Sequence, residues 1–481
     1  MKKIPKYKRD EFTFVSNLSQ YTANDKYPNT YQRDAYLLSE HYTNARTVDL
    51  ARKVKKRRNL LISDNGNYSR MKAVAKQYEQ GGLLLLRQAK KEQQQYGQLS
   101  NETRLARQQL MREIAQSCQK QVEETNYKKV IQDQLLIRPD YLIGMEDLTI
   151  PVLMLCHLMH PIFQPQALAI LDYQNNTFQY VKDQQSGRYG SKQGLETVNN
   201  FTVLHAYDYD SAYQAGKNAL NLAKDGLAIS YGGPMHSRRW IDCLRIGGNK
   251  IQLSEKLPEA YLIAQTITQG AINGHPTNIP FHILGVGTPI LIALIGYQLR
   301  HSKAISIDST APFKDAFIGK LYGYKNAYLK MDMFKLVAYC LIQDVPFEDK
   351  SPFYQSFAQK YEHDWKGLRD KLGVRPNNTV KELASKLRER GDWLQDYLPF
   401  FTPITGTLEA AFLQDLRIAR AGYNYWVLKQ ICRKVRAKRS DENAFKRWIE
   451  RQIDQYTKTA SSKWAKAVNF AYLLTEGHRM V

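Results

Sequence analysis

One carboxylate stands where a strand–helix unit of this chain would place a catalytic group. Residues 307–314 read Ile-Asp-Ser-Thr-Ala-Pro-Phe-Lys, and shortly before them residues 282–289 read His-Ile-Leu-Gly-Val-Gly-Thr-Pro. We interpret the two segments as consecutive strand ends of a (β/α)8 barrel, the first closing in a glycine turn. This architecture carries its catalytic groups at the C-terminal tips of its strands. Asp308 is therefore a candidate nucleophile, and the alternative is that it caps the helix that follows.

Two further segments end in acidic residues. Asn59-Leu-Leu-Ile-Ser-Asp64 is a short apolar run before polar and glycine residues, which predicts a buried strand and a loop. Asp64 is followed by Asn-Gly, so a purely conformational role in a turn is the alternative to a chemical one. Residues 140–147 predict another strand, which ends in Glu146 and Asp147; the alternative there is a solvated acidic pair.

The elements that would position these groups alternate along the chain. Long helices are predicted over 69–136, and regular strand–helix alternation follows them. The predicted strands are 202–206, 226–231, 281–286 and 303–308, and the predicted helices between them are 210–224, 257–272 and 289–301. Such repeats imply a parallel sheet, and the polar strand ends favour a closed barrel over an open sheet. We therefore expect an α/β fold with a TIM-type (β/α)8 barrel.

The chain length of 481 residues leaves room for more than the barrel. We assign residues 1–58 to a basic N-terminal arm, 59–320 to the barrel with insertions, and 321–481 to a helical, basic C-terminal region. The arm ends in the run Arg-Lys-Val-Lys-Lys-Arg-Arg, and the C-terminal region contains Arg-Lys-Val-Arg-Ala-Lys-Arg. Both runs are candidate phosphate contacts, and an ordinary solvated surface is the alternative for each.

The formal net charge of +23 points to a polyanionic partner, with nucleic acid first and an anionic membrane second. The most apolar stretch, residues 283–297, is interrupted by glycine and proline and is too short to span a bilayer. The N-terminus lacks the apolar core of a signal peptide. The five cysteines are scattered without a CxxC pair, which argues against a zinc site and a disulfide framework. We expect a cytoplasmic protein with no membrane partner.

Four segments together resemble the tRNA-guanine transglycosylase superfamily. Residues 63–68 look like its Ser-Asp-Ser-Gly-Gly-Tyr/Phe motif, and 225–233 resemble its Asp-Gly-x-Ala-Ile-Gly-Gly strand. Residues 281–289 are similar to its hydrophobic-Gly-Val-Gly-Thr/Lys-Pro motif, and 308–314 to its nucleophile segment. The segments follow the family's order over roughly residues 59–320.

The resemblance implies roles for individual residues. It makes Asp308 the nucleophile and Asp64 the acid that protonates the leaving guanine. Tyr68 would stack on the base, Leu284 would close the other face, and Glu146, or else Asp147, would accept the guanine N–H groups. The remaining residues are Gly232 and Gly233, whose amides would approach the base carbonyl, and Lys314, which matches a family position that faces the nucleic acid. Independently of the resemblance, Arg238 and Arg239 follow the glycine pair and are candidate phosphate contacts. For the glycines a plain turn is the alternative, for the arginines a solvated surface and for Leu284 a core position.

The departures from the family decide which branch the chain resembles. The tRNA enzymes carry a Cys-x-Cys-x-x-Cys…His zinc site after the nucleophile, whereas here only Cys340 lies nearby. Asn65 and Asn67 stand where small residues are usual. The chain looks most like the DpdA-type enzymes, which exchange guanine in DNA for a 7-deazaguanine such as 7-cyano-7-deazaguanine. This chemistry needs only carboxylates, so no metal or other cofactor is implied.

Two alternatives remain beside DNA base exchange, apart from an unrelated barrel hydrolase or lyase. One is a tRNA-guanine transglycosylase, which would share Asp64, Asp308 and Tyr68. The other is a non-catalytic nucleic-acid-binding protein on a barrel of the same kind. The sequence leaves open which 7-deazaguanine enters and whether an accessory protein is needed.

Overall fold

The structure is a computed structural model of the 481-residue chain. It describes residues 11–18, 35–56, 59–163, 176–177, 179–183, 186, 195, 198–205, 219, 225–231, 240–246, 249–258, 262, 268–272, 279–302, 304–323, 329–347 and 350–476.

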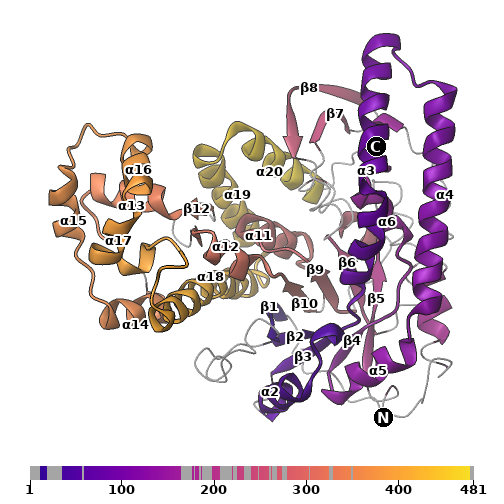
Figure 1. The fold of residues 1–481 in the computed structure, drawn as a ribbon, viewed down its shortest axis with the longest axis horizontal. Coiled ribbons are helices and arrows are strands. Elements are labelled where there is room, and N and C mark those ends of the chain that lie inside the picture. The colour runs from indigo at the N-terminus through magenta and orange to yellow at the C-terminus, as the bar shows by residue number, and fades with distance from the viewer. Residues whose placement is uncertain are drawn as a thin grey trace.

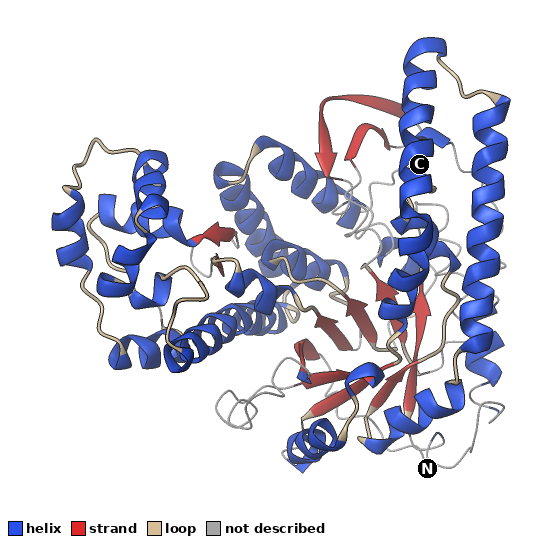
Figure 2. Ribbon diagram, in the orientation of Figure 1, coloured by secondary structure: helices blue, strands red, loops and turns tan. Residues whose placement is uncertain are grey.

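A closed barrel of eight parallel strands forms the centre of the molecule (Figure 2). The strands are β1 (Glu11–Asn17), β2 (Ala35–Ser39), β3 (Leu60–Asp64), β4 (Tyr141–Ile143), β5 (Asn199–Leu204), β6 (Leu227–Ser230), β9 (Phe281–Leu284) and β10 (Ala304–Asp308). Their order around the barrel is β1-β10-β9-β6-β5-β4-β3-β2, and the β1–β10 pair closes it. The predicted α/β (β/α)8 fold is confirmed.

The interior of the barrel follows from the two-residue alternation of each strand. One row of side chains fills the inside with branched and aromatic residues, among them Val15, Leu37, Ile62, Ile143 and Phe201. The intervening side chains point outward and pack under the surrounding helices, as Phe12 and Phe14 of β1 do. The barrel is therefore a filled core, and its polar groups collect where the strands end.

Two barrel strands lie in the segment that the sequence analysis assigned to a basic arm. β1 pairs with β10 and with β2, so the barrel begins at Glu11 instead of Asn59. A short 3₁₀ helix, η2 (Glu40–Tyr42), and the helix α2 (Ala45–Lys56) follow β2. These strands are short and are flanked by Lys, Arg and Tyr, so the local composition does not mark them as strands. β1 is held in the barrel by pairing with β10, which is distant in sequence. Residues 1–10, 19–34 and 57–58 of the expected arm lie outside the described residues.

An insertion between β3 and β4 forms a long helical hairpin. It consists of α3 (Asn67–Tyr96) and α4 (Asn101–Glu124), which lie side by side and extend well beyond the barrel (Figure 1). The shorter α5 (Tyr127–Leu136) leads into β4, and α6 (Thr149–Leu155) and η3 (Pro161–Phe163) follow it. The hairpin packs on α6 through a separate apolar cluster that includes Val74, Leu86 and Leu153. The predicted helical segment 69–136 thus comprises three helices.

The helices around β9, β10 and β1 join the barrel to the C-terminal region. α11 (Pro289–Gln298) is buried on all sides, because it lies between the barrel and the helices α18, α19 and α20. Its Gly296 permits a close helix contact, since a Cβ there would lie 2.7 Å from a methyl of Val435. α12 (Ala311–Phe317) follows β10, and α18 (Ala410–Lys438) packs against β1, α11 and α12. The long α18 therefore covers the barrel beside β1, although it comes from the region predicted to be separate.

The rest of the C-terminal region is helical, as predicted. Helices α13 to α17 form a lobe to one side of the barrel, and α19 and α20 lie across α11 (Figure 1). The elements are α13 (Met333–Ile342), α14 (Pro352–Lys360), α15 (Trp365–Leu372), α16 (Val380–Glu389), α17 (Gly391–Tyr397), η5 (Pro399–Phe401), α19 (Glu442–Thr459) and α20 (Ser462–Thr475). Two antiparallel strand pairs complete the fold: β7 (Trp240–Ile246) with β8 (Asn249–Pro258), and β11 (Lys320–Tyr322) with β12 (Lys330–Asp332). None of the helices in the described residues is long and apolar enough to cross a membrane.

Candidate active site

Asp64 and Asp308 are the last residues of β3 and β10, and both occupy the inward-facing row of their strands. Leu60 and Ile62 precede Asp64 in this row and belong to the interior cluster, and Ala304 precedes Asp308 in the same way. Because all strands are parallel, the two carboxylates meet at the same end of the barrel. The sequence placed each of them on a strand end, and the closed barrel brings them to one mouth.

The carboxylate of Asp308 is held by the glycine turn after β9. The backbone N–H of Gly285 donates to Asp308 Oδ1 at 3.2 Å and to the Asp308 carbonyl oxygen at 3.0 Å. Gly285 has a φ of 86°, a conformation that favours glycine. The helix-capping alternative does not describe Asp308, because the Ala311 N–H at the start of α12 donates to the Ser309 hydroxyl instead. The Asp308 carboxylate is thus directed into the mouth.

Burial raises the pKa of Asp308 to about 7, and the negative charge of Asp64 contributes to the rise. The hydrogen bond from Gly285 opposes it by stabilising the ionised form. The side chain is 14 % exposed, so it is largely dry and still reachable from the mouth. A carboxylate of this kind is weakly solvated when ionised, which favours nucleophilic attack.

Asp64 makes the turn that its sequence suggested and faces the mouth as well. Its Oδ2 accepts the N–H of Gly66 at 3.2 Å, and the Ser39 hydroxyl at the end of β2 is a further partner. Burial raises the pKa of Asp64 to about 6, and the charge of Glu146 adds to this. The turn and the chemical role are therefore compatible, because the turn occupies only part of the carboxylate's hydrogen-bonding capacity.

The structure separates Glu146 from Asp147. Glu146 is 4 % exposed; its Oε1 accepts from Asn67 Nδ2 at 3.3 Å, and its Oε2 contacts His205 Nε2. Asp147 instead accepts the Thr149 N–H at 2.7 Å at the start of α6, and the Asn176 amide at 3.1 Å. Glu146 lies near Asp64, whereas the Asp147 carboxylate binds the backbone at the start of α6 and the Asn176 side chain.

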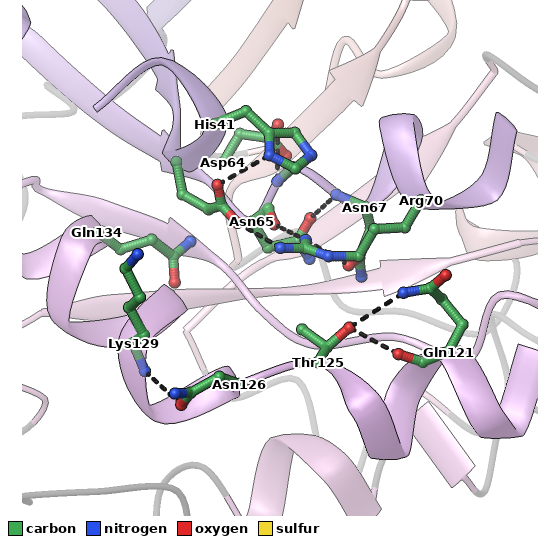
Figure 3. Close-up of polar contacts among 12 residues, drawn as sticks. His41, Asp64, Asn65, Asn67, Arg70, Gln121, Thr125, Asn126, Lys129 and Gln134 are labelled. Carbon is green, nitrogen blue, oxygen red and sulfur yellow. Dashed lines mark hydrogen bonds and ion pairs between the residues drawn. The ribbon is translucent and has the colours of Figure 1, made fainter. Parts of the chain in front are cut away.

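A network of amides joins the loop after β3 to the loop after β4 (Figure 3). Asn65 accepts the Asn67 N–H at 2.9 Å and donates to the Gly144 carbonyl at 2.6 Å. Arg70 donates to Asn67 Oδ1 at 3.1 Å and also contacts the Asn65 carbonyl and Glu40. Sequence reasoning treated Asn65 and Asn67 as departures from a motif, but they hold Asp64 and Glu146 in a common frame.

Three other predicted residues lie in different surroundings. Leu284 ends β9 in its inward row and packs on the interior cluster, so it borders the mouth. Tyr68 follows Asn67 at the start of α3; its ring packs against the apolar cluster of α3, α4 and α6, with Lys72 Nζ 4.6 Å from the ring centre. Lys314 is exposed on α12.

His282 is a site residue that sequence reasoning missed. It is fully buried in the inward row of β9, with Nδ1 2.8 Å from the Ser306 hydroxyl and its ring stacked on Phe201. Burial lowers its pKa to about 3, so the ring is neutral. Its Nε2 has no hydrogen-bond partner in the described part of the chain and lies 3.6 Å from Asp308 Oδ1. The two-residue alternation back from Leu284 would have found it.

Gly232, Gly233, Arg238 and Arg239 lie outside the described residues. Over the parts that are described, no group of three or more His, Cys, Asp or Glu side chains is arranged to hold a metal ion.

One barrel mouth therefore combines two carboxylates with raised pKa values, a buried glutamate with spare acceptor capacity, and an apolar wall. No known family model and no curated protein matches this chain in sequence.

Proposed function

We propose that the chain is a DNA-guanine transglycosylase, a pentosyltransferase that replaces guanine in DNA by a 7-deazaguanine base. The observation that carries the proposal is the pairing of Asp64 and Asp308 at one mouth, where the charge of one raises the pKa of the other. Base exchange needs a nucleophile and a proton donor side by side, and a carboxylate pair of this kind supplies both.

In the first step the Asp308 carboxylate attacks C1′ of the target nucleoside, and the glycosidic C1′–N9 bond breaks. Asp64 gives its proton to the leaving guanine, and an ester between Asp308 and C1′ remains. In the second step Asp64 takes the N9 proton of the incoming base, whose N9 attacks C1′ and frees Asp308. Two inversions at one carbon return the original configuration, as in retaining glycosidases.

Glu146 is the proposed reader of the base. Guanine and 7-deazaguanines present N1–H and N2–H₂ donors, which need an acceptor such as a carboxylate. Asn67 and His205 occupy part of the Glu146 carboxylate, and an ionised carboxyl group has about four acceptor positions, so some remain for a base. Leu284 would cover one face of the base, and the part of the Tyr68 ring that is not packed on the hairpin cluster would stack on the other, for about 1–3 kcal/mol.

The choice of DNA rests on the resemblance to the DpdA-type branch and on the missing cysteine motif after Asp308. A tRNA-guanine transglycosylase would use the same residues and is the second candidate. A duplex substrate would have to flip the guanosine out, at a cost of a few kcal/mol, roughly, which phosphate contacts of a chain with net charge +23 would offset.

The test is incorporation of radiolabelled 7-cyano-7-deazaguanine or guanine into DNA and tRNA, assayed side by side with wild type and Asp308→Asn. Label that enters DNA and is lost in the variant supports the proposal. Label that enters only tRNA selects the second candidate. Absence of label in both, although the nucleic acids bind, would favour a non-catalytic binding protein.

A further inference from the structure

The two helices of the hairpin differ in charge. Helix α3 carries six basic and two acidic side chains, a net of +4, whereas α4 carries four of each and is neutral. The two helices have similar lengths and pack against each other, so α4 is a suitable comparison for the charge of α3. Within the hairpin, the excess of positive charge belongs to α3.

The exposed cations of α3 lie on one face. Lys76, Arg87 and Lys91 are separated by 11 and 4 residues, which places them within about 60° around the helix and spreads them over about 22 Å along it. We call these three residues the α3 stripe. The opposite face holds Met71, Leu85 and the other residues packed on α4 and α6. The stripe therefore faces away from the hairpin's own core.

The stripe lacks ion pairs within the described residues, although the exposed Glu79 lies three residues from Lys76. None of its three cations forms an ion pair there. Glu92, which is close in sequence, is engaged elsewhere: it accepts the Ser100 N–H at 2.8 Å and the Thr103 hydroxyl at 2.7 Å across the hairpin turn. On α4, by contrast, Lys120 lies 3.6 Å from Glu124. The stripe is thus a row of three cations that form no ion pair among the described residues.

The structure also fixes the stripe relative to the mouth. Helix α3 starts in the amide network, where Asn67 bonds Glu146 and Arg70 bonds Asn67. Farther along, α3 touches the end of α6 closely, since a Cβ at Gly82 would lie 1.9 Å from the Cys156 carbonyl oxygen. Tyr78 and Ser117 join α3 to α4 with a 2.6 Å hydrogen bond. The stripe therefore lies on a helix that starts in the network beside the mouth and extends away from the barrel (Figure 1).

We propose that the α3 stripe binds the phosphate backbone of the nucleic acid whose guanosine enters the barrel mouth. The proposal rests on the function proposed above and names the surface that would hold the substrate strand. A row of point charges matches a phosphate backbone, which repeats its charge at every nucleotide. Such contacts fix register and orientation and carry no sequence information.

The experiment compares full-length wild type with two triple variants. One is Lys76→Gln/Arg87→Gln/Lys91→Gln in the stripe. The matched control, Arg104→Gln/Arg112→Gln/Lys120→Gln, removes the same charge from exposed positions of α4. Gln keeps a good helix propensity, and melting followed by circular dichroism checks that both variants fold. Binding to labelled single-stranded DNA, duplex DNA and a tRNA is measured by fluorescence anisotropy over a salt series.

We expect the stripe variant to lose about 2 to 3 units from the slope of log affinity against log salt, because each lost phosphate contact removes about 0.7–0.9. The control should lose less than about 1 unit. Equal slopes for the two variants, or no binding by the wild type, would overturn the proposal. The label assay separates the stripe proposal from the proposed function. If the wild type exchanges the base and the stripe variant binds with the same salt dependence as wild type, only the stripe proposal is wrong. If the salt slope falls in the stripe variant but the wild type exchanges no base, the stripe binds nucleic acid and the proposed enzyme activity is wrong.

Discussion

Asp64 and Asp308 occupy corresponding positions at the ends of two barrel strands, but their surroundings differ. Asp64 lies in a polar frame formed by the Ser39 hydroxyl, the Gly66 N–H and the charge of Glu146. Asp308 has the Gly285 N–H as its donor and the neutral ring of His282 below it. The β3 end is a network of amides and carboxylates. The β10 end is a single carboxylate above the buried, neutral imidazole of His282.

The difference indicates how two identical side chains can take two roles. A nucleophile benefits from few hydrogen bonds, because ionised oxygen atoms that are weakly solvated attack more readily. A proton carrier benefits from a fixed position and a pKa near the working pH. Burial brings the pKa of both carboxyls near neutrality, to about 6 for Asp64 and about 7 for Asp308. Under the proposed function, the few hydrogen bonds of Asp308 fit the nucleophile and the polar frame of Asp64 fits the proton carrier.

The largest expected effect is on the β10 side. Asp308→Asn should lower base exchange by about 10⁴-fold or more, because the covalent intermediate cannot form. The covalent adduct with nucleic acid should disappear from denaturing gels, while anisotropy shows unchanged nucleic-acid affinity. Residual exchange at a tenth of the wild-type rate would show that Asp308 is not the nucleophile.

Substitution on the β3 side should cost less. Asp64→Asn removes proton transfer and should slow exchange by about 10²- to 10⁴-fold, since the nucleophile remains. It also removes a negative charge that raises the pKa of Asp308, so the rising limb of the pH–rate profile should move to lower pH. A limb that stays in place would mean that the two carboxyls do not interact and that the two strand ends act independently.

Glu146→Gln tests the polar frame around Asp64; it leaves both aspartates in place but removes a charge that raises the pKa of Asp64. Because a carboxylate acceptor for the base becomes an amide, we expect the KM for the incoming base to rise about 10- to 100-fold, with a smaller change in kcat. Steady-state kinetics with varied base concentration measures both.

The control for Glu146 is its neighbour. Asp147→Ala should leave the KM for the base unchanged and lower the free energy of unfolding by about 0.5–2 kcal/mol, because it removes a bond at the start of α6. If Asp147→Ala raises the KM and Glu146→Gln changes only stability, then Asp147 and not Glu146 is the acceptor for the base.

The last prediction concerns the pH dependence of stability and not the rate of exchange. The folded pKa of Asp308, about 7, lies above the ordinary value of 3.8, so the folded state binds this proton more tightly than the unfolded state. Ionised Asp308 therefore reduces stability progressively between about pH 4 and pH 7. Asp308→Asn should be more stable than wild type above pH 7 and equal to it near pH 4. Urea melts at both pH values measure this, and a constant difference would contradict the raised pKa.

Parts of this architecture were readable in the chain because their signals are local. The apolar runs before Asp64 and Asp308, the glycine turn at 285 and the helical pattern of 69–136 each depend on a few adjacent residues. The strands β1 and β2 were missed because a strand of five to seven residues in a basic, tyrosine-rich segment is weakly marked. The position of α18 beside β1 was missed because helix periodicity does not reveal the partner.

The sequence alone therefore determined the fold class and the two strand-end carboxylates, since period-two alternation and turn residues are encoded in neighbouring positions. Only the tertiary structure decided that β1 closes the barrel against β10, that Glu146 and not Asp147 lies near Asp64, and that His282 lies beneath Asp308. The physical reason is that burial, pKa shifts and charge coupling depend on distances between residues far apart in the chain, and these distances exist only once the barrel is closed.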